Sequence, residues 1–261
     1  MSDREFVDVE RDGHVAIVSL DRADAHNALS GAMCDELHEA FDEVGAERDV
    51  WVMILRARGT KAFCVGADLK ERKSFTLDDF YANRRQVRTM FDALRGVPQP
   101  TIAAPFGFAL GGGMELVLSC DIVVAARDTV FGLPEPRVGL LPGGGGTQLL
   151  ARKVGLGRAK DLLLRGARFD ADEARAMGLV GRVVERDELD GAALDVAAEV
   201  CACSPVALRA VKRAVDGALG VPLTEGIELE HDAWRVVIAS EDRAEGIAAF
   251  NDKRAPQWKN R

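Results

Sequence analysis

The segment 107–146 contains two glycine-rich turns, and it constrains the fold and chemistry of this chain more than any other segment. The first turn holds the triplet 111–113 and the second the run 143–146. Glycine adopts backbone angles that other residues avoid, and it lets a ligand or a second backbone approach closely. One glutamate lies near each turn, Glu115 after the triplet and Glu135 before the run. Bare amides beside two carboxylates suggest a site that holds an oxyanion and moves protons.

Short runs of β-branched and apolar residues alternate along the chain with segments of helical periodicity. This alternation predicts an α/β fold. The predicted strands are residues 15–20, 51–55, 101–104, 122–125 and 180–184, and residues 59–70 are predicted as a loop. The predicted helices are residues 30–44, 76–95, 114–119, 147–154, 158–164 and 172–177.

Beyond the last predicted strand the chain changes character, because only helical segments follow. Ser204 and Pro205 are an N-cap and a favoured first-turn residue of one such helix. We therefore expect two parts, a core with the active site in residues 1–190 and a helical C-terminal part in residues 191–261. Trp258 near the end suggests that this part packs against the core or against another subunit.

Composition excludes several classes of partner. The formal net charge of −8 argues against nucleic-acid binding through overall charge. No apolar run approaches the roughly 18 residues that a membrane span requires, and the charged N-terminus does not resemble a secretory signal. The 5 cysteines are scattered and odd in number, which fits reduced thiols. We therefore expect a cytoplasmic protein without a membrane or nucleic-acid partner.

The first glycine triplet has a functional and a structural interpretation. If Gly112 begins a helix, its free amide lies at the positive end of the helix dipole and can bind a developing negative charge. Gly66 and Ala67 in the earlier loop could supply a second amide. Alternatively, three glycines simply allow a helix and a strand to pack tightly.

Glu115 lies about one helical turn beyond Gly112 and has apolar neighbours in the sequence. An unpaired buried carboxylate is costly, so Glu115 either pairs with a cation or has a raised pKa. Arg127 and Arg137 are the candidate cations. A raised pKa would suit a proton donor that works near neutral pH.

Glu135 lies between Pro134 and Pro136, which stiffen the loop and fix the direction of the carboxylate. The alternative is an exposed acid in a turn. Two carboxylates at a glycine-lined site could hold one water between them, so that one accepts a proton while the other donates one.

Other catalytic motifs are missing from the sequence. It contains neither phosphate-binding glycine fingerprint, and no serine lies in a G-x-S-x-G elbow. The 4 histidines are widely separated and include no H-E-x-x-H pair, so a metal site is not expected.

Three segments together resemble the crotonase family, and enoyl-CoA hydratases in particular. They are residues 61–71 (KAFCVGADLKE), 101–125 (TIAAPFGFALGGGMELVLSCDIVVA) and 131–150 (FGLPEPRVGLLPGGGGTQLL), and the likeness extends over nearly the whole chain. The resemblance implies a spiral core of ββα units with a helical C-terminal trimerisation part. It also implies a homotrimer or a dimer of trimers.

The resemblance assigns roles to individual residues. Ala67 and Gly112 match the oxyanion-hole amides that bind the thioester carbonyl, and Glu115 and Glu135 match the two catalytic glutamates. The residues that match the acyl-CoA binding site are Ala67, Asp68, Leu69, Lys70, Gly112 and Gly143. Phe250 and Lys253 match tail positions that contact CoA bound to a neighbouring subunit.

The implied activity is hydration of 2-enoyl-CoA thioesters to 3-hydroxyacyl-CoA, with CoA as part of the substrate and no metal or redox cofactor. His26 departs from the family, which more often has an apolar residue there. Residues 133–135 and the ending APQWKNR also resemble crotonobetainyl-CoA hydratase (carnitinyl-CoA dehydratase). Crotonobetainyl-CoA hydration and enoyl-CoA isomerisation are therefore alternative activities. A catalytically silent scaffold or RNA-binding protein is a third alternative, which the acidic charge and the intact acid pair disfavour.

Overall fold

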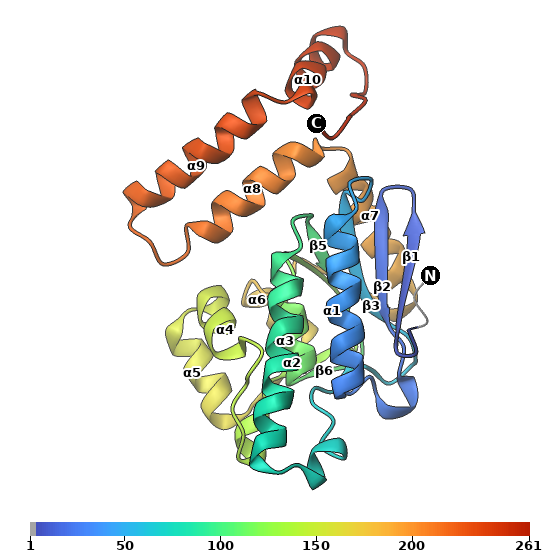
Figure 1. Ribbon diagram of the computed structural model, residues 1–261, viewed down its shortest axis with the longest axis vertical. Coiled ribbons are helices and arrows are strands. Elements are labelled where there is room, and N and C mark those ends of the chain that lie inside the picture. The colour runs from blue at the N-terminus through green and yellow to red at the C-terminus, as the bar shows by residue number, and fades with distance from the viewer. Residues whose placement is uncertain (1–3) are drawn as a thin grey trace.

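Two β-sheets form the centre of the computed structural model, which describes residues 4–261 (Figure 1). The larger sheet has six strands in the order β1-β2-β3-β5-β7-β10, and the smaller has four in the order β4-β6-β8-β9. Neighbouring strands are parallel, apart from the antiparallel pairs β1–β2 and β8–β9. The predicted α/β class is confirmed.

The strands predicted from the sequence correspond to β2, β3, β5, β7 and β10, and the other five were not predicted. β1 is a charged edge strand, and each strand of the smaller sheet has three residues, too few to show a period. The loop predicted at 59–70 is wrong for β4, which lies inside it. The strands are β1 (Val7–Asp12), β2 (Val15–Leu20), β3 (Val52–Ala57), β4 (Ala62–Cys64), β5 (Thr101–Ala103), β6 (Phe108–Leu110), β7 (Ile122–Ala126), β8 (Val130–Gly132), β9 (Arg168–Asp170) and β10 (Arg182–Val184).

All six predicted helices are present, with ends that differ by a few residues. Three begin at side-chain caps: Ser30 accepts a hydrogen bond from the amide of Met33, and Thr76 and Asp170 form capping boxes with Asp79 and Glu173. The helices are α1 (Gly31–Ala46), α2 (Leu77–Gly96), α3 (Gly112–Ser119), α4 (Gly146–Val154), α5 (Leu156–Arg165), α6 (Ala171–Ala176), α7 (Leu189–Cys201), α8 (Pro205–Gly217), α9 (Leu223–Ile238) and α10 (Glu241–Asp252). Two short 3-10 helices near the site are η2 (Glu71–Ser74) and η3 (Glu135–Val138).

The larger sheet is covered on both faces, which explains why β2 is buried along its whole length. One face packs against α1, α2 and α3 through a large apolar cluster that includes Leu37, Phe91 and Met114. The other face packs against α7 through Ala193 and Ala197. α3 is buried at every residue, so this core fixes the position of its first turn.

The C-terminal helices extend away from the sheets as an α8–α9 hairpin followed by α10 (Figure 1). Trp258 packs beside Gly246, and its indole nitrogen donates a hydrogen bond to the carbonyl of Ala202 at 3.0 Å. The boundary predicted between residues 190 and 191 lies inside α7, and the division into two parts stays a prediction.

Within residues 4–261, no single helix is long and apolar enough to cross a bilayer. Only the α7 and α8 segments taken together are long and apolar enough, and they are bent by 100° relative to each other. α7 buries its apolar side against the larger sheet.

Candidate active site

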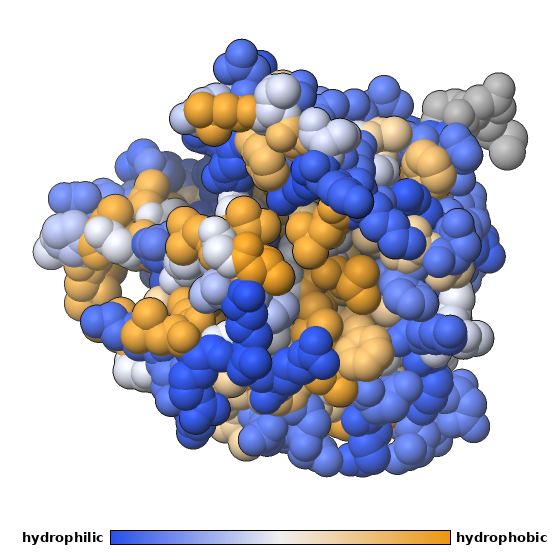
Figure 2. Space-filling view, turned by 90° about the horizontal axis from the view of Figure 1, so that it is seen from below, coloured by the Kyte–Doolittle hydropathy of each residue, from blue (hydrophilic) through white to orange (hydrophobic). Residues whose placement is uncertain are grey.

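A cavity of about 410 Å³ lies between α2, the start of α3 and η3. α2 begins at the lower end of Figure 1, and the view from below shows apolar side chains near the middle of that face with hydrophilic residues around them (Figure 2). Exposed apolar residues of the cavity wall are Leu69, Phe80, Val138 and Leu141. The cavity is therefore mostly apolar, as small-molecule sites usually are.

Gly112 is the first residue of α3, as predicted, and Gly111 before it has φ +53°. A Cβ built on Gly66, which has φ +88°, would lie 2.8 Å from the nitrogen of Gly112. A Cβ built on Gly112 would lie 3.9 Å from the nitrogen of Ala67. The amides of Ala67 and Gly112 are therefore close neighbours. Within residues 4–261, neither amide donates a hydrogen bond.

The structural interpretation of the triplet also holds, but for a different glycine. A Cβ on Gly113 would lie 2.1 Å from the carbonyl oxygen of Cys64, so this position must stay bare for α3 to pack on β4. The earlier loop is fixed by hydrogen bonds from the amide of Leu29 to the carbonyl of Gly66 and from the amide of Asp68 to the carbonyl of Leu29. These contacts hold the two free amides in place.

Glu115 is only 3% exposed, and the second glycine turn binds its carboxylate. Its Oε1 accepts hydrogen bonds from the amides of Gly144 at 2.7 Å and Gly146 at 2.8 Å. Burial raises the pKa of Glu115, while these amides and the positive charge of Arg84 act in the opposite direction. The sequence did not indicate Gly144 and Gly146 as partners, because they lie about thirty residues away along the chain.

The ion pair considered for Glu115 is absent from the part of the chain that the structure describes. Arg127 instead pairs with Asp172 and Glu185. Arg137 donates hydrogen bonds to the backbone carbonyls of residues 165 and 166. The interpretation of Glu115 as half of an ion pair with either arginine is therefore wrong.

Glu135 begins η3 and is partly buried in the cavity wall, so the interpretation as an exposed turn acid is also wrong. A Cβ built on Gly111 would lie 3.1 Å from its Oε1, which places the carboxylate beside the first glycine turn. Its Oε2 is buried and has no hydrogen-bond partner among residues 4–261. Burial, together with the charge of Glu115, raises the pKa of Glu135 to about 7.

The other predicted binding residues fall into two groups. Leu69 and Gly143 line the cavity together with Ala67 and Gly112. Asp68 and Lys70 do not line it. Asp68 is paired with Arg22 at 2.7 Å and accepts a hydrogen bond from the amide of Lys70 at 2.9 Å, so its carboxylate shapes the loop.

Phe250 and Lys253 lie at the end of α10, far from the cavity of their own chain (Figure 1). Phe250 is exposed, and Lys253 ends the helix in a left-handed conformation. Their contact with CoA in a neighbouring subunit stays a prediction. Arg72, Asn83 and Arg84 also line the cavity. They could not be identified beforehand, because Asn83 and Arg84 are only two of several polar residues in the predicted helix 76–95, and Arg72 lies before it.

Among residues 4–261, no group of three or more histidine, cysteine, aspartate or glutamate side chains could hold a metal ion. The arrangement instead joins two free amides with two acids of unequal environment. Such a site can stabilise an oxyanion and transfer protons at an adjacent carbon.

The family profile of enoyl-CoA hydratase/isomerase matches residues 10–261. A probable enoyl-CoA hydratase of Mycobacterium tuberculosis is 41% identical over 98% of this chain and 99% of its own length. Human mitochondrial methylglutaconyl-CoA hydratase is 37% identical over 96% of this chain and 75% of its own. The crystal structure of an enoyl-CoA hydratase from Bacillus anthracis superimposes with a TM-score of 0.96 at 39% identity, covering 98% of this chain and all of that one.

Proposed function

Because the chain belongs to the enoyl-CoA hydratase/isomerase (crotonase) family, we propose that it adds water across the 2,3-double bond of 2-enoyl-CoA thioesters. The product is the 3-hydroxyacyl-CoA. The observation that carries this proposal is the pair of acids at one cavity: two amides bind Glu115, whereas Oε2 of Glu135 is buried without a hydrogen-bond partner among residues 4–261. An enzyme that adds water across a double bond needs a base that deprotonates the water and an acid that protonates the adjacent carbon.

The amides of Ala67 and Gly112 would bind the thioester oxygen. Negative charge develops on this oxygen when water attacks C3, because the electrons of the double bond move into the carbonyl to give an enolate. Amides that are already fixed and unpaired stabilise this charge without reorganisation, and one such donor typically contributes about 3 kcal/mol.

The two glutamates would divide the proton transfers. Glu115 has two amide donors that favour its ionised form, so it serves as the base that takes one proton from the attacking water. Glu135, whose pKa is raised to about 7, keeps a substantial protonated fraction at neutral pH, and this form gives its proton to C2. The water oxygen bonds to C3, and the second water proton stays on the new hydroxyl group.

The substitution Glu135→Gln tests this assignment. We expect kcat for crotonyl-CoA hydration to fall about 10²- to 10⁴-fold, the usual contribution of a general acid, as followed by loss of the enoyl-thioester absorbance. Glu39→Gln, on the exposed side of α1, is the matched control and should retain full activity. Undiminished hydration by Glu135→Gln would exclude the proposed role.

Product analysis separates hydration from the alternative reactions. The enzyme is incubated with 2-enoyl, 3-enoyl and crotonobetainyl thioesters, and the products are identified by mass and retention time. Movement of a double bond without gain of water would favour an isomerase. Turnover restricted to the crotonobetainyl thioester would favour the specialised hydratase.

We also propose that the chain assembles as a homotrimer or a dimer of trimers. Apolar side chains on the α8–α9 hairpin are more than one-third exposed in the single chain, and burial between subunits would remove them from water. They include Val211, Val215, Leu223, Ile227 and Trp234. A monomeric mass by light scattering would contradict this proposal.

A further inference from the structure

The cavity is positively charged, although the chain as a whole is acidic. The ionisable residues that line it are Arg72, Arg84, Arg137, Arg168 and Glu135, whereas the chain has a formal net charge of −8. An aliphatic acyl chain that fills the cavity would displace water from these guanidinium groups and supply no anion in exchange. The charge of the wall therefore points to a ligand that carries an anionic group.

Arg84 is the one of these arginines that has no partner within residues 4–261. Arg137 donates hydrogen bonds to two backbone carbonyls, and Arg168 lies over the ring of Phe108 at 5.9 Å. Arg72 donates a hydrogen bond to Asn83. The guanidinium of Arg84 makes no hydrogen bond, ion pair or aromatic contact with that part of the chain, so it is free to bind a ligand.

Arg84 lies beside the glycine turn that binds Glu115. A Cβ built on Gly143 would lie 3.5 Å from its Nη1, and the next residue, Gly144, binds Glu115. If the thioester oxygen binds at Gly112 and the acyl chain extends past the two glutamates toward α2, its distal end comes to Arg84. CoA would then extend away from Arg84, on the other side of the thioester.

Arg72 and Asn83 supply further groups suited to an anion. Arg72 donates from Nη2 to Oδ1 of Asn83 at 2.8 Å, its Nε is buried without an acceptor, and it forms no ion pair with residues 4–261. Asn83 is 5% exposed, and its Nδ2 has no acceptor in the same part of the chain. A carboxylate near Asn83 would accept from Nδ2 and would offset the unpaired charge of Arg72.

We propose that Arg84, together with Asn83, binds a carboxylate at the distal end of the acyl chain. The preferred substrates would then be 2-enoyl-CoA thioesters of dicarboxylic acids. This inference rests on the proposed hydratase function for the site. It adds Arg84 as a specificity-determining residue and names the class of acyl group.

The test compares two substrates with acyl chains of five carbons, glutaconyl-CoA with a terminal carboxylate and pent-2-enoyl-CoA with a methyl group. We expect the wild-type enzyme to have the higher kcat/KM for glutaconyl-CoA, by about tenfold or more, because a hydrogen bond to a charged group is stronger than a neutral one. Arg84→Gln should abolish this preference. Arg85→Gln, the neighbouring arginine outside the cavity wall, should preserve it.

Two results would overturn the inference. One is a wild-type preference for pent-2-enoyl-CoA. The other is an equal loss with both substrates in Arg84→Gln, which would assign the arginine to the CoA phosphates. If no substrate is hydrated, the hydratase function fails, and calorimetry with glutaryl-CoA and pentanoyl-CoA still decides the anion site. Tighter binding of glutaryl-CoA that Arg84→Gln removes would support it, and equal dissociation constants would refute it.

Discussion

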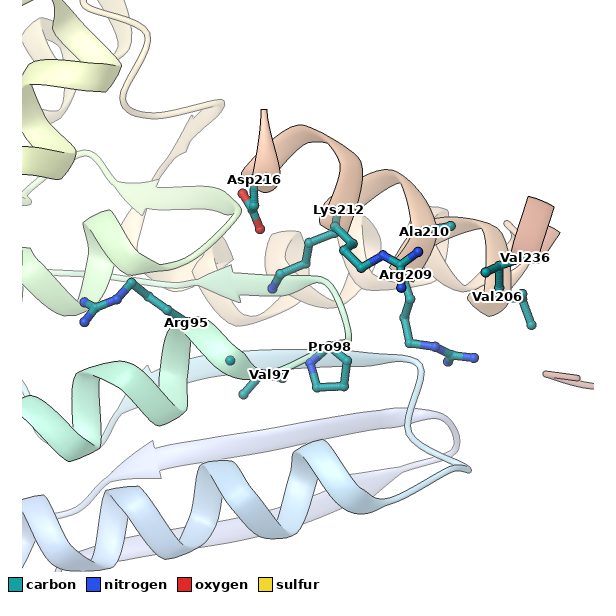
Figure 3. Close-up of a pocket in the computed structure, with 12 residues that line it drawn as sticks. Arg95, Val97, Pro98, Val206, Arg209, Ala210, Lys212, Asp216 and Val236 are labelled. Atoms are coloured by element: carbon teal, nitrogen blue, oxygen red, sulfur yellow. The ribbon is translucent and has the colours of Figure 1, made fainter. Parts of the chain in front are cut away.

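Two cavities of this molecule differ in size and in chemistry, and the smaller one has the features of an active site. The cleft between α8 and the end of α2 has a volume of about 670 Å³, against about 410 Å³ for the cavity beside α3 (Figure 3). In the larger cleft Lys212 is already paired with Asp121 at 2.7 Å.

Within residues 4–261, the smaller cavity has two unpaired amides, an unpaired arginine, and two buried polar atoms without a partner, Oε2 of Glu135 and Nε of Arg72. The larger cleft also has unpaired charged groups, Arg213 and Asp216, but these are exposed to water. Buried polar atoms that lack a partner, rather than volume, therefore distinguish the candidate site.

Arg95 connects the two regions. It lines the larger cleft, and Figure 3 shows its side chain extending away from Lys212 and the other labelled residues of α8. Its Nη1 donates a hydrogen bond to the carbonyl of Gly144 at 2.7 Å, and Asp92 binds its other end at 2.6 Å. Since the amide of Gly144 binds Glu115, Arg95 fixes the turn that holds this carboxylate.

Of the substitutions that compare the two cavities, Gly66→Ala in the smaller one should have the largest effect. The new Cβ would lie 2.8 Å from the amide nitrogen of Gly112 and would displace one oxyanion donor, so kcat for crotonyl-CoA should fall about 10²- to 10³-fold. Gly178→Ala is the control, because Gly178 also has positive φ but has no atom within 4 Å of the built Cβ. It should lose stability and keep its rate. Equal rates in the two variants would contradict the oxyanion role.

The pH dependence of the rate should follow Glu135. Because its pKa is raised to about 7, the protonated form needed for hydration is lost above that pH, and kcat/KM should fall about tenfold per pH unit there. The free energy of unfolding should also decrease with rising pH. The folded state binds this proton more tightly than the unfolded state, so the stabilisation present below pH 4.5 is lost as the pH rises to about 7. The residual activity of Glu135→Gln should lack the alkaline decline, and a decline that persists would exclude Glu135 as its origin.

Arg95→Gln should have an intermediate effect, although Arg95 lines the cleft without the acids. Loss of its hydrogen bond to Gly144 loosens the amide that binds Glu115, and we expect kcat to fall about tenfold with little change in KM. The fall in kcat/KM above about pH 7, which Glu135 sets, should stay in place. The fall at low pH, where Glu115 becomes protonated, should shift. Arg88→Gln is the control, because Arg88 contacts the same Asp92 and its side chain is 73% exposed. Arg95→Lys should recover part of the rate. Wild-type kinetics in Arg95→Gln would show that Arg95 does not influence the position of Glu115.

Lys212→Met should have the smallest effect on the rate. Lys212 is largely buried between α8 and the core, where it pairs with Asp121 and donates to the carbonyl of Gln99 at 3.1 Å. Its loss leaves Asp121 without its cation, so we expect about 1–3 kcal/mol of destabilisation in thermal unfolding and a kcat within about twofold of wild type. The exposed Lys160→Met should change neither quantity. A large loss of rate in Lys212→Met would show that the larger cleft takes part in catalysis.

Local sequence patterns were enough to predict the fold class and the main chemical groups. The periodicities located β2, β3 and α2, and the caps Ser30 and Thr76 marked two helix starts, because these signals depend on neighbouring residues. The bare amide of Gly112 and the two glutamates could also be identified from local order, since Gly112 to Glu115 spans one turn of a helix.

How these groups act depends on contacts between segments that are distant in the chain. The sequence left open whether Glu115 pairs with an arginine, and the fold instead brings the amides of Gly144 and Gly146 to it. The pKa of Glu135 depends on burial in a wall built from separate segments, and the free guanidinium of Arg84 depends on which face of α2 meets the cavity. The burial and the hydrogen-bond partners of these side chains are set by residues that are distant in the chain. Local sequence patterns do not show which distant residues come together.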